Sequence, residues 1–307
     1  MNSPRVVIVV LSWNGRDDTL NCLASLRLLT YPAYQVVVVD NGSTDGSVEA
    51  IRAEYPDVSL IETGENLGYV GGNNAGLSWA LERGGDYVLL LNNDTEVAPE
   101  FLSELVRVAE SVPSVGIVGP TIYYFDRPQT IWSAGGAIDW ARGETRMIGL
   151  DEADTGQFGC EPRPVDFVTG CALLVKSRVI QQIGMLDLRF FAYYEDAEWS
   201  VRAARAGFAI WHVPSAKIWH KILPERRAAS PQTHYYMTRN RLLFLRCTGA
   251  GYGAWFHTLV DDLRTILSWT LRPKWHDKRA QRDSMAIAIR DYFLRRAGHA
   301  ELGRRPS

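Results

Sequence analysis

Acidic and amide side chains occur in two short segments, each directly after a run of apolar residues. Asp40 begins the segment Asp40–Gly46, and Asn92, Asn93 and Asp94 follow the second run. A carboxylate or amide can bond to a nucleotide base or a ribose hydroxyl. Asp94 could also bind Mg2+ or Mn2+, which prefer oxygen ligands and bridge to substrate phosphates. Either segment would also suit a turn that caps the next helix.

A second kind of chemistry is suggested by two adjacent carboxylates, Glu195 and Asp196, within the aromatic segment Phe190–Trp199. Apolar neighbours raise the pKa of a carboxyl group, so one of the pair could act as a general base. Aromatic side chains also suit the C–H faces of a sugar ring. Acidic residues at the start of a helix are the simpler alternative, since they favour the helix dipole. His220, much later in the chain, could complete a cation site begun by Asp94.

The segment Glu65–Gly76 is rich in glycine and contains Asn66, Gly72 and Asn73. We interpret it as a loop leading into a helix, where backbone N–H groups can approach a phosphate or a sugar. No Gly-Lys-Ser/Thr follows, and the GxGxxG spacing after the first strand is absent. The segment is therefore neither a P-loop nor a nicotinamide-binding turn.

The hydrophobic pattern predicts an α/β fold with a mostly parallel sheet and helices on both faces. Predicted strands alternate with predicted helices of about ten residues, which is typical of βαβ units. The strands are Val6–Leu11, Val36–Val39, Val58–Glu62 and Tyr87–Leu91, and the helices are Asp17–Leu29, Ser47–Tyr55, Asn73–Arg83 and Pro99–Ser111. Because ligands bind outside the carboxyl ends of such strands, we expect the polar segments to form one site.

The later chain is less regular. We expect a loop or a small antiparallel excursion over Asp139–Asp166, then a strand over Val168–Ser177, a helix over Asp196–Ala206 that ends at Gly207, and a strand over Phe208–Val213. The chain after Pro224 is predicted to be helical. The predicted division is a catalytic domain over 1–225 and a basic, Trp-rich helical region over 226–307.

In this order the motifs resemble family 2 glycosyltransferases with the GT-A fold, in particular the rhamnosyltransferase-like group. The resemblance covers about residues 6–220. Its motifs are Ser12–Gly15, Val39–Gly46, Asn66–Gly68, Gly71–Gly76, Leu91–Thr95, Thr169–Val175, Gly184–Trp199 and His220. The resemblance implies a Rossmann-like nucleotide-binding domain.

The resemblance and the residue chemistry together define an expected site. The nucleotide-binding residues are Ser12, Asn14, Asp40, Asn66, Gly72, Asn73, Asn92 and Asn93. The implied ligands of a divalent cation, Mg2+ or Mn2+, are Asp94 and His220. The resemblance makes Asp196 the catalytic base, with Glu195 and Trp199 facing the acceptor. Asn92 replaces the first Asp of the family's DxD motif, which reduces the negative charge available to the metal.

The implied reaction is an inverting transfer from a nucleotide-diphospho-sugar, with dTDP-L-rhamnose as the best match. UDP-galactofuranose, UDP-hexoses and GDP-sugars remain alternative donors. The expected acceptor is a glycan or a polyprenyl-pyrophosphate-linked glycan of the cell envelope. A nucleotidyltransferase would carry a Gly-rich loop with Arg and Lys after the first strand, which Ser12–Asp17 does not. A non-catalytic nucleotide-sugar-binding protein would not need Asp94, Asp196 and His220 together.

The charge distribution favours an anionic partner for the C-terminal region. Residues 241–307 carry 13 Lys and Arg against 6 Asp and Glu, whereas residues 1–240 carry 20 against 29. Basic, Trp-rich amphipathic helices lie at membrane surfaces. Alternatively, this region packs on the domain or on a second subunit of a homo-oligomer. The basic residues form no nucleic-acid-binding motif. We expect a cytoplasmic protein, peripheral on the inner face of the plasma membrane, because the sequence has no signal peptide, no membrane-spanning run and four scattered cysteines.

Overall fold

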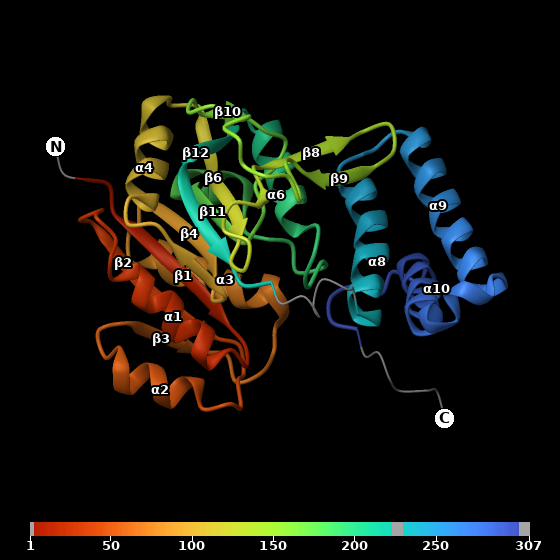
Figure 1. The fold of residues 1–307 in the computed structure, drawn as a ribbon, viewed down its shortest axis with the longest axis horizontal. Helices are drawn as coiled ribbons and strands as arrows, with labels where there is room; N and C mark the ends of the chain where they lie inside the picture. The colour runs from red at the N-terminus through yellow and green to blue at the C-terminus, as the bar shows by residue number, and fades with distance from the viewer. Residues whose placement is uncertain (1–2, 223–229, 301–307) are drawn as a thin grey trace.

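The computed structural model describes residues 3–222 and 230–300 and is built on a ten-stranded sheet (Figure 1). The strands of this sheet are β1 (Val6–Ser12), β2 (Tyr34–Asp40), β3 (Ser59–Glu62), β4 (Tyr87–Asn92), β5 (Thr95–Val97), β6 (Val115–Tyr124), β7 (Ile131–Ser133), β10 (Arg163–Pro164), β11 (Ala172–Lys176) and β12 (Ala209–His220). A separate hairpin pairs β8 (Gly136–Asp139) with β9 (Glu144–Met147), which confirms a small antiparallel excursion in this part of the chain.

The main path of the sheet runs β10-β12-β6-β11-β4-β1-β2-β3. The strands β3, β2, β1 and β4 pair in parallel, and so do β6 and β12. The strand β11 is antiparallel to both of its neighbours, β4 and β6. The sheet is thus mixed but mostly parallel, and the predicted α/β class is confirmed.

Helices cover both faces of the sheet. The helices of the described residues are α1 (Arg16–Leu26), α2 (Ser47–Glu54), α3 (Gly68–Glu82), α4 (Phe101–Ser111), α5 (Ser177–Ile183) and α6 (Glu195–Arg205), followed by a C-terminal group of α8 (Pro231–Cys247), α9 (Tyr252–Leu271), the 3-10 helix η1 (Pro273–Lys278) and α10 (Arg279–Phe293). Side chains alternate along β1, so Val6, Ile8 and Val10 pack with α1 and α4, whereas Val7 and Val9 pack with α3 and α6. This two-sided burial explains the unbroken apolar sequence of the central strands.

The glycine-rich segment differs from its prediction, because α3 begins at Gly68 rather than at Asn73. Its glycines allow the helix to lie close to the sheet. A Cβ atom added to Gly72 would lie 2.4 Å from Leu11 Cδ1, and one added to Gly76 would lie 2.2 Å from Val9 Cγ1. Gly72 and Asn73 are both buried inside this contact. Both residues pack toward the sheet, and their predicted contact with the nucleotide stays a prediction.

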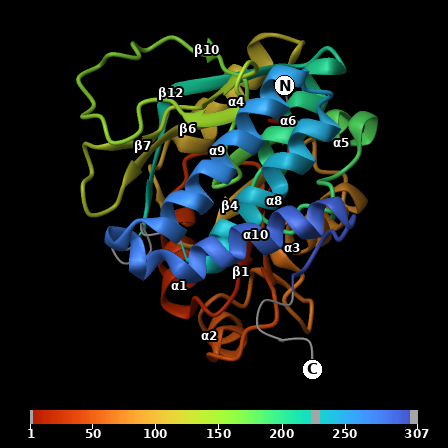
Figure 2. The ribbon, with the colours of Figure 1, turned by 90° about the vertical axis from the view of Figure 1, so that its right-hand side faces the viewer.

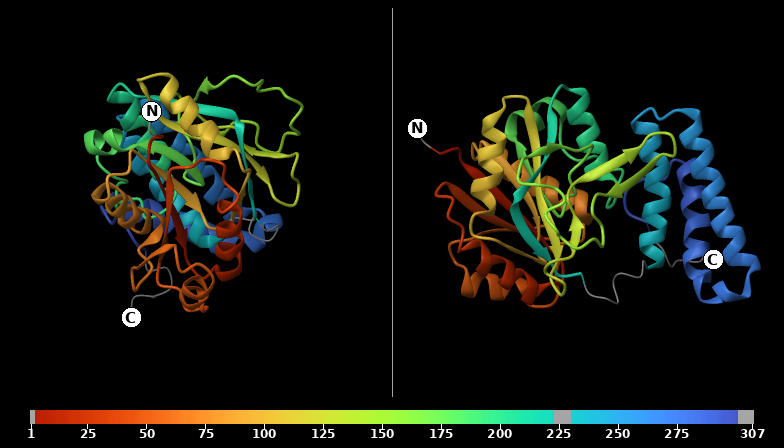
Figure 3. Two further views of the ribbon diagram at one scale, coloured as in Figure 1. Left: turned by 90° about the vertical axis from the view of Figure 1, so that its left-hand side faces the viewer. Right: turned by 45° about the horizontal axis from the view of Figure 1, so that its top comes forward.

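The helices α8, α9 and α10 lie together beside the sheet, with α8 nearest to it (Figures 1 and 3). Figure 2 faces this side and shows α9 and α10 as its outer layer. Leu243 and Phe244 of α8 belong to the same apolar cluster as one face of the sheet. The predicted boundary at 225/226 lies outside the described residues. Within the described ranges, none of the helices combines the length and the apolar character that a membrane span requires.

Candidate active site

The carboxyl ends of three neighbouring strands bring the predicted polar residues to one edge of the sheet. Ser12 at the end of β1 is paired with Asp40 at the end of β2. On the other side of β1, Leu11 is paired with Asn92 of β4. The in-register parallel pairing therefore places all three polar segments at the same edge, as the sequence predicted.

Asp40 has an acceptor atom available for a ligand. The residue is only 3% exposed, and its Oδ2 accepts a hydrogen bond from the N–H of Ser43 at 3.0 Å. Its Oδ1 is buried and has no hydrogen-bond partner among the described residues. Because an unsatisfied buried acceptor is costly, a ligand N–H or hydroxyl bound there would be strongly favoured. This geometry fits the base-binding role predicted for Asp40.

Asn14 joins the first loop to the second. It adopts a φ of +50°, and its Oδ1 accepts a hydrogen bond from the N–H of Thr44 at 2.8 Å. Its own N–H donates to Ser43 Oγ at 2.9 Å. Ser12 is fully buried, and its hydroxyl bonds to that of Thr19 at 2.8 Å. Ser12 therefore stabilises the first loop from the protein interior, while Asn14 bonds it to the second loop.

Two residues at this edge were missed by the sequence reasoning. Trp13 lies between Ser12 and Asn14 and is 55% exposed, so its ring is available to a ligand. Asn41 is buried and organises the turn before α3. Its Oδ1 accepts from the N–H of Leu67 at 3.0 Å, and its Nδ2 donates to Asn66 Oδ1 at 3.1 Å. The amide oxygen of Asn66 is thus engaged within the protein. The position of Asn41 directly after Asp40 was the available signal.

The predicted cation ligands come from distant parts of the sequence and meet in the structure. His220 Nε2 lies 3.1 Å from Asp94 Oδ1. Adjacent ligands of an octahedral Mg2+ are about 3.0 Å apart when each lies about 2.1 Å from the metal, so the pair fits a shared cation. Among the described residues, no cluster of three or more His, Cys, Asp or Glu could hold a metal. Donor phosphates and water would have to supply the remaining ligands.

The local charges explain how this pair is held. Burial alone would lower the pKa of His220, but Cys171 and the Asp94 carboxylate raise it well above its usual range. A bound cation would replace the proton on the imidazole. Asn93 ties the strand end to α1, since its Nδ2 donates to Thr19 Oγ1 at 2.9 Å.

The dipeptide Gly170–Cys171 connects the strand end to the proposed base. The carbonyl of Cys171 accepts the N–H of Asn92 at 2.9 Å, and the N–H of Gly170 donates to Asp196 Oδ2 at 2.9 Å. A Cβ at position 170 would lie 2.3 Å from the Tyr69 hydroxyl, so a larger residue would displace the Tyr69 side chain. The antiparallel strand β11 thus brings Asp196 to the edge that carries Asn92 and Asp94.

Asp196 and Glu195 occupy the first turn of α6. Burial raises the pKa of Asp196, although backbone N–H groups of Gly170 and Ala197 act in the opposite direction. Asp196 Oδ1 accepts the Ala197 N–H at 2.7 Å. Glu195 is buried, with no hydrogen-bond partner for Oε2 in the described part of the chain, and burial followed by the charge of Asp196 raises its pKa well above the usual range. The pair combines one hydrogen-bonded carboxylate with one carboxyl group that favours its protonated form.

Trp199 points into the protein interior, and its predicted contact with the acceptor stays a prediction. Its side chain is fully buried in the apolar core, and its indole N–H donates to the carbonyl of Gly184 at 2.9 Å. The aromatic pattern gave no indication of which face of α6 would be buried. Phe190, at the other end of the same segment, is also fully buried.

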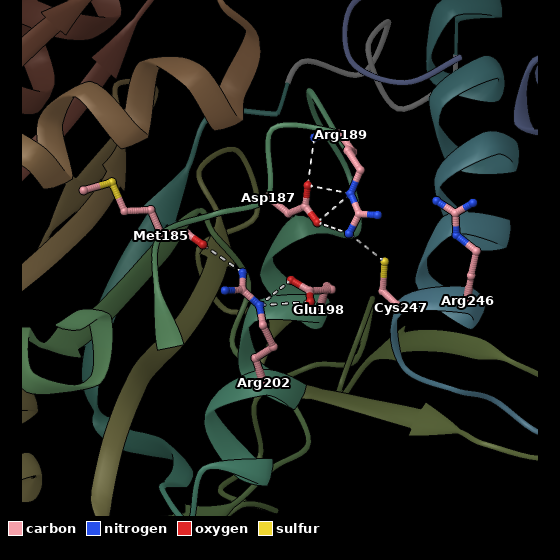
Figure 4. Close-up of a pocket in the computed structure, with 7 residues that line it drawn as sticks. All are labelled: Met185, Asp187, Arg189, Glu198, Arg202, Arg246 and Cys247. Carbon is pink, nitrogen blue, oxygen red and sulfur yellow. Dashed lines mark hydrogen bonds and ion pairs between the residues drawn. The ribbon is translucent and has the colours of Figure 1, made fainter. Parts of the chain in front are cut away.

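A cavity of about 460 Å3 lies between α6, α8 and the segment that precedes α6 (Figure 4). It is lined by Met185, Asp187, Arg189, Glu198, Arg202, Arg246 and Cys247. None of these is a predicted site residue. Much of its charge is already paired, since Arg189 bonds to Asp187, and Arg202 Nε lies 2.9 Å from Glu198. The cavity is therefore distinct from the strand-end site.

A Rossmann-like sheet with polar strand ends, a candidate cation pair and a nearby carboxylate defines the chain as a GT-A glycosyltransferase in architecture. The model of glycosyl transferase family 2 matches residues 7–183. The chain therefore belongs to glycosyl transferase family 2.

The curated relatives of this chain include two rhamnosyltransferases. The chain is 30% identical to an N-acetylglucosaminyl-diphospho-decaprenol L-rhamnosyltransferase of Mycobacterium tuberculosis, over 86% of this chain and 88% of that protein. It is 27% identical to the dTDP-rhamnosyl transferase RfbF of Shigella flexneri, over 80% and 81%. A solved mannosyltransferase of Pyrobaculum calidifontis, in complex with GDP-Man and Mn2+, matches in fold with a TM-score of 0.56 at 16% identity, over 96% and 88%.

Proposed function

We propose that this protein transfers L-rhamnose from dTDP-L-rhamnose, with inversion, to a lipid-diphosphate-linked glycan acceptor. The donor and acceptor classes are suggested by the two rhamnosyltransferase relatives. The observation that carries the mechanism is the hydrogen-bonded link from Asn92 through Gly170–Cys171 to Asp196. It places one carboxylate beside the edge at which the strand-end residues would hold the donor.

In the proposed mechanism, Asp40 and Asn14 hold the base and ribose end of the donor. Asp196 accepts the proton of the acceptor hydroxyl, whose oxygen then attacks the anomeric carbon as the bond to the nucleoside diphosphate breaks. The raised pKa of Asp196 makes it a stronger base than an ordinary aspartate. One base and one displacement invert the anomeric configuration, and no covalent enzyme intermediate is formed.

Asp94 and His220 would hold the divalent cation. When bound, the cation stabilises the negative charge that develops on the departing diphosphate. This proposal is supported by the 3.1 Å separation of the two side chains and by the Mn2+ in the mannosyltransferase of similar fold.

The test is a donor panel that contains dTDP-L-rhamnose, UDP-galactofuranose, UDP-glucose and GDP-mannose. Each donor is incubated with a polyprenyl-diphosphate-linked N-acetylglucosamine acceptor and Mn2+, Mg2+ or EDTA. We expect metal-dependent transfer from dTDP-L-rhamnose, with inverted anomeric configuration in the product NMR spectrum. Transfer from another donor alone would overturn the rhamnosyl assignment, and a retained configuration would overturn the single-displacement mechanism.

We also propose that α9 rests on an anionic membrane surface, where such an acceptor resides. The helix exposes Tyr252, Phe256, Leu263, Leu267 and Leu271. At 100° per residue, these positions fall within about 100° of one another around the helix axis. A continuous apolar face on a basic region suits an interfacial helix.

Liposome flotation tests this membrane contact. The double variant Phe256→Ser and Leu267→Ser should lose binding to vesicles that contain phosphatidylglycerol. The control is Leu28→Ser, which changes an exposed leucine just after the end of α1 and should bind like the wild type. Unchanged binding of the α9 variant would refute the membrane contact. A smaller oligomer of the variant than of the wild type in ultracentrifugation would instead assign the face to a second subunit.

A further inference from the structure

The segment directly before the proposed base has an unfavourable backbone conformation. Phe191, Tyr193 and Tyr194 have φ angles of +65°, +70° and +72°. Side chains with a Cβ avoid this left-handed region, and bulky residues are rarely found in it. Three such residues within four positions persist only where the surrounding structure holds them. Glu195 and Asp196 follow immediately, so whatever holds this segment also determines where the carboxylates point.

Asn240 of α8 provides much of that support. It is fully buried, and its Nδ2 lies 2.8 Å from the carbonyl oxygen of Phe190, 2.7 Å from that of Ala192 and 3.0 Å from that of Tyr193. One side-chain amide thus donates to the carbonyls around the strained turn. Its orientation is fixed, because Asn240 Oδ1 accepts a hydrogen bond from Arg239 Nε at 2.9 Å.

Arg239 holds the beginning of the same segment. It is 2% exposed, and its Nη2 donates to the carbonyls of Arg189 at 3.1 Å and Phe190 at 3.0 Å. Its Nη1 donates to the carbonyl of Gly298 at 2.7 Å, and the Gly298 N–H donates to the Arg189 carbonyl at 2.9 Å. Burying a charged guanidinium costs desolvation free energy that an apolar side chain would not, which argues for a specific role of Arg239.

Other elements hold the segment from its remaining sides. The N–H of Val70 in α3 donates to the carbonyl of Phe191 at 3.0 Å. At the cavity in Figure 4, the side chain of Arg189 is bonded to Asp187. The segment therefore lies between the sheet-bound α3 and the C-terminal helix α8. Among the described elements, only α8 contributes buried side chains that bond to several of these carbonyls in succession.

We propose that Arg239 and Asn240 are positioning residues for the transfer reaction, and that α8 is thereby part of the active site. They hold the turn 189–194 in its left-handed conformation, so that Asp196 stays bonded to Gly170 and faces the acceptor. This inference rests on the proposed role of Asp196 as the base.

The test compares turnover with donor binding. Asn240→Ala should lower kcat on the order of 100-fold, because a small misplacement of a reacting group has an effect of that size. The Kd of the donor should stay within about threefold of the wild-type value, since Asp40 and Asn14 lie on other elements. Asn240→Ser keeps one hydrogen-bond donor, so its kcat should lie between those of the wild type and Asn240→Ala. This variant replaces the alanine variant if the latter does not fold.

Leu245→Ala is the matched control for lost stability. Leu245 is buried in the same helix but packs against Gly143 of the β8–β9 hairpin. It should lower the melting temperature while kcat at 20 °C stays within about threefold. The proposal is overturned if the Asn240 variants keep wild-type kcat, or if Leu245→Ala loses turnover equally. Full turnover of Asp196→Asn would instead refute the proposed base itself.

Discussion

Replacing Asp196 by Asn removes the proposed base with the smallest possible change in shape. Asp196 accepts two backbone hydrogen bonds, from Gly170 at Oδ2 and from Ala197 at Oδ1. The amide oxygen of Asn can accept only one of them, and its NH2 group then faces a second donor. An unmet hydrogen bond of this kind costs about 1–3 kcal/mol of folding stability. We therefore expect a lower melting temperature by several degrees but a folded protein.

The effect on turnover should be much larger than the effect on stability. A positioned general base contributes about 100- to 10,000-fold to a rate, and this should be the loss in kcat. The assay is transfer to the lipid-linked acceptor at 20 °C, with donor Kd measured by calorimetry to show that the donor site is intact. The wild-type kcat should also fall at low pH as Asp196 is protonated. Since burial raises the pKa of Asp196, this acid limb should lie above that of an ordinary aspartate, and the variant should lack it.

A kcat of the Asp196→Asn variant within threefold of the wild type would refute the assignment. Loss of donor binding in parallel with turnover would show that the residue supports the donor site instead. Because Asp196 and Glu195 interact, the wild-type profile reports the pair, and a Glu195→Gln variant separates the two contributions.

Three further outcomes are expected. Trp199→Phe should destabilise the protein by about 1–3 kcal/mol because the hydrogen bond to the Gly184 carbonyl is lost, with the acceptor KM unchanged. A raised acceptor KM would instead support the predicted contact of Trp199 with the acceptor. Asp94→Asn should weaken donor binding, measured by calorimetry, at least about tenfold in Mn2+ but not in EDTA. Equal weakening under both conditions would show that Asp94 is not a metal ligand. Asp262→Asn should stabilise the protein at pH 8 but not at pH 4, by up to about 3 kcal/mol in thermal unfolding. Burial raises the pKa of Asp262 to about 6, so the contribution of this side chain to folding stability falls as pH rises from about 4 to 6. Equal melting temperatures of the wild type and the Asp262→Asn variant at pH 8 would contradict this.

The strands and the site edge could be predicted because their signals are local. Val6–Leu11 is apolar throughout since β1 is buried on both faces, and Asp40 and Asn92 mark the ends of its neighbours. The direction of β11 could not be predicted, because an apolar run does not specify whether a strand is parallel. The close packing of Gly72 against the sheet could not be predicted, because helix packing and phosphate binding favour the same residue type. The role of Asn240 depends on carbonyls about 50 positions away, which no local pattern contains.

The residues that form the site are widely separated along the chain, and this separation determines the order in which a nascent protein can bring them together. The strands β1 to β4, which carry Ser12, Asp40 and Asn92, are complete once 92 residues have emerged. The partner of Asp94 is His220, and the support for the Asp196 turn comes only with α8. Since N-terminal parts fold first during synthesis, the donor edge can form well before the reacting groups are in place. A chain that has emerged only to residue 222 would therefore contain Asp196 and His220 but would lack α8, which supports the turn before Asp196.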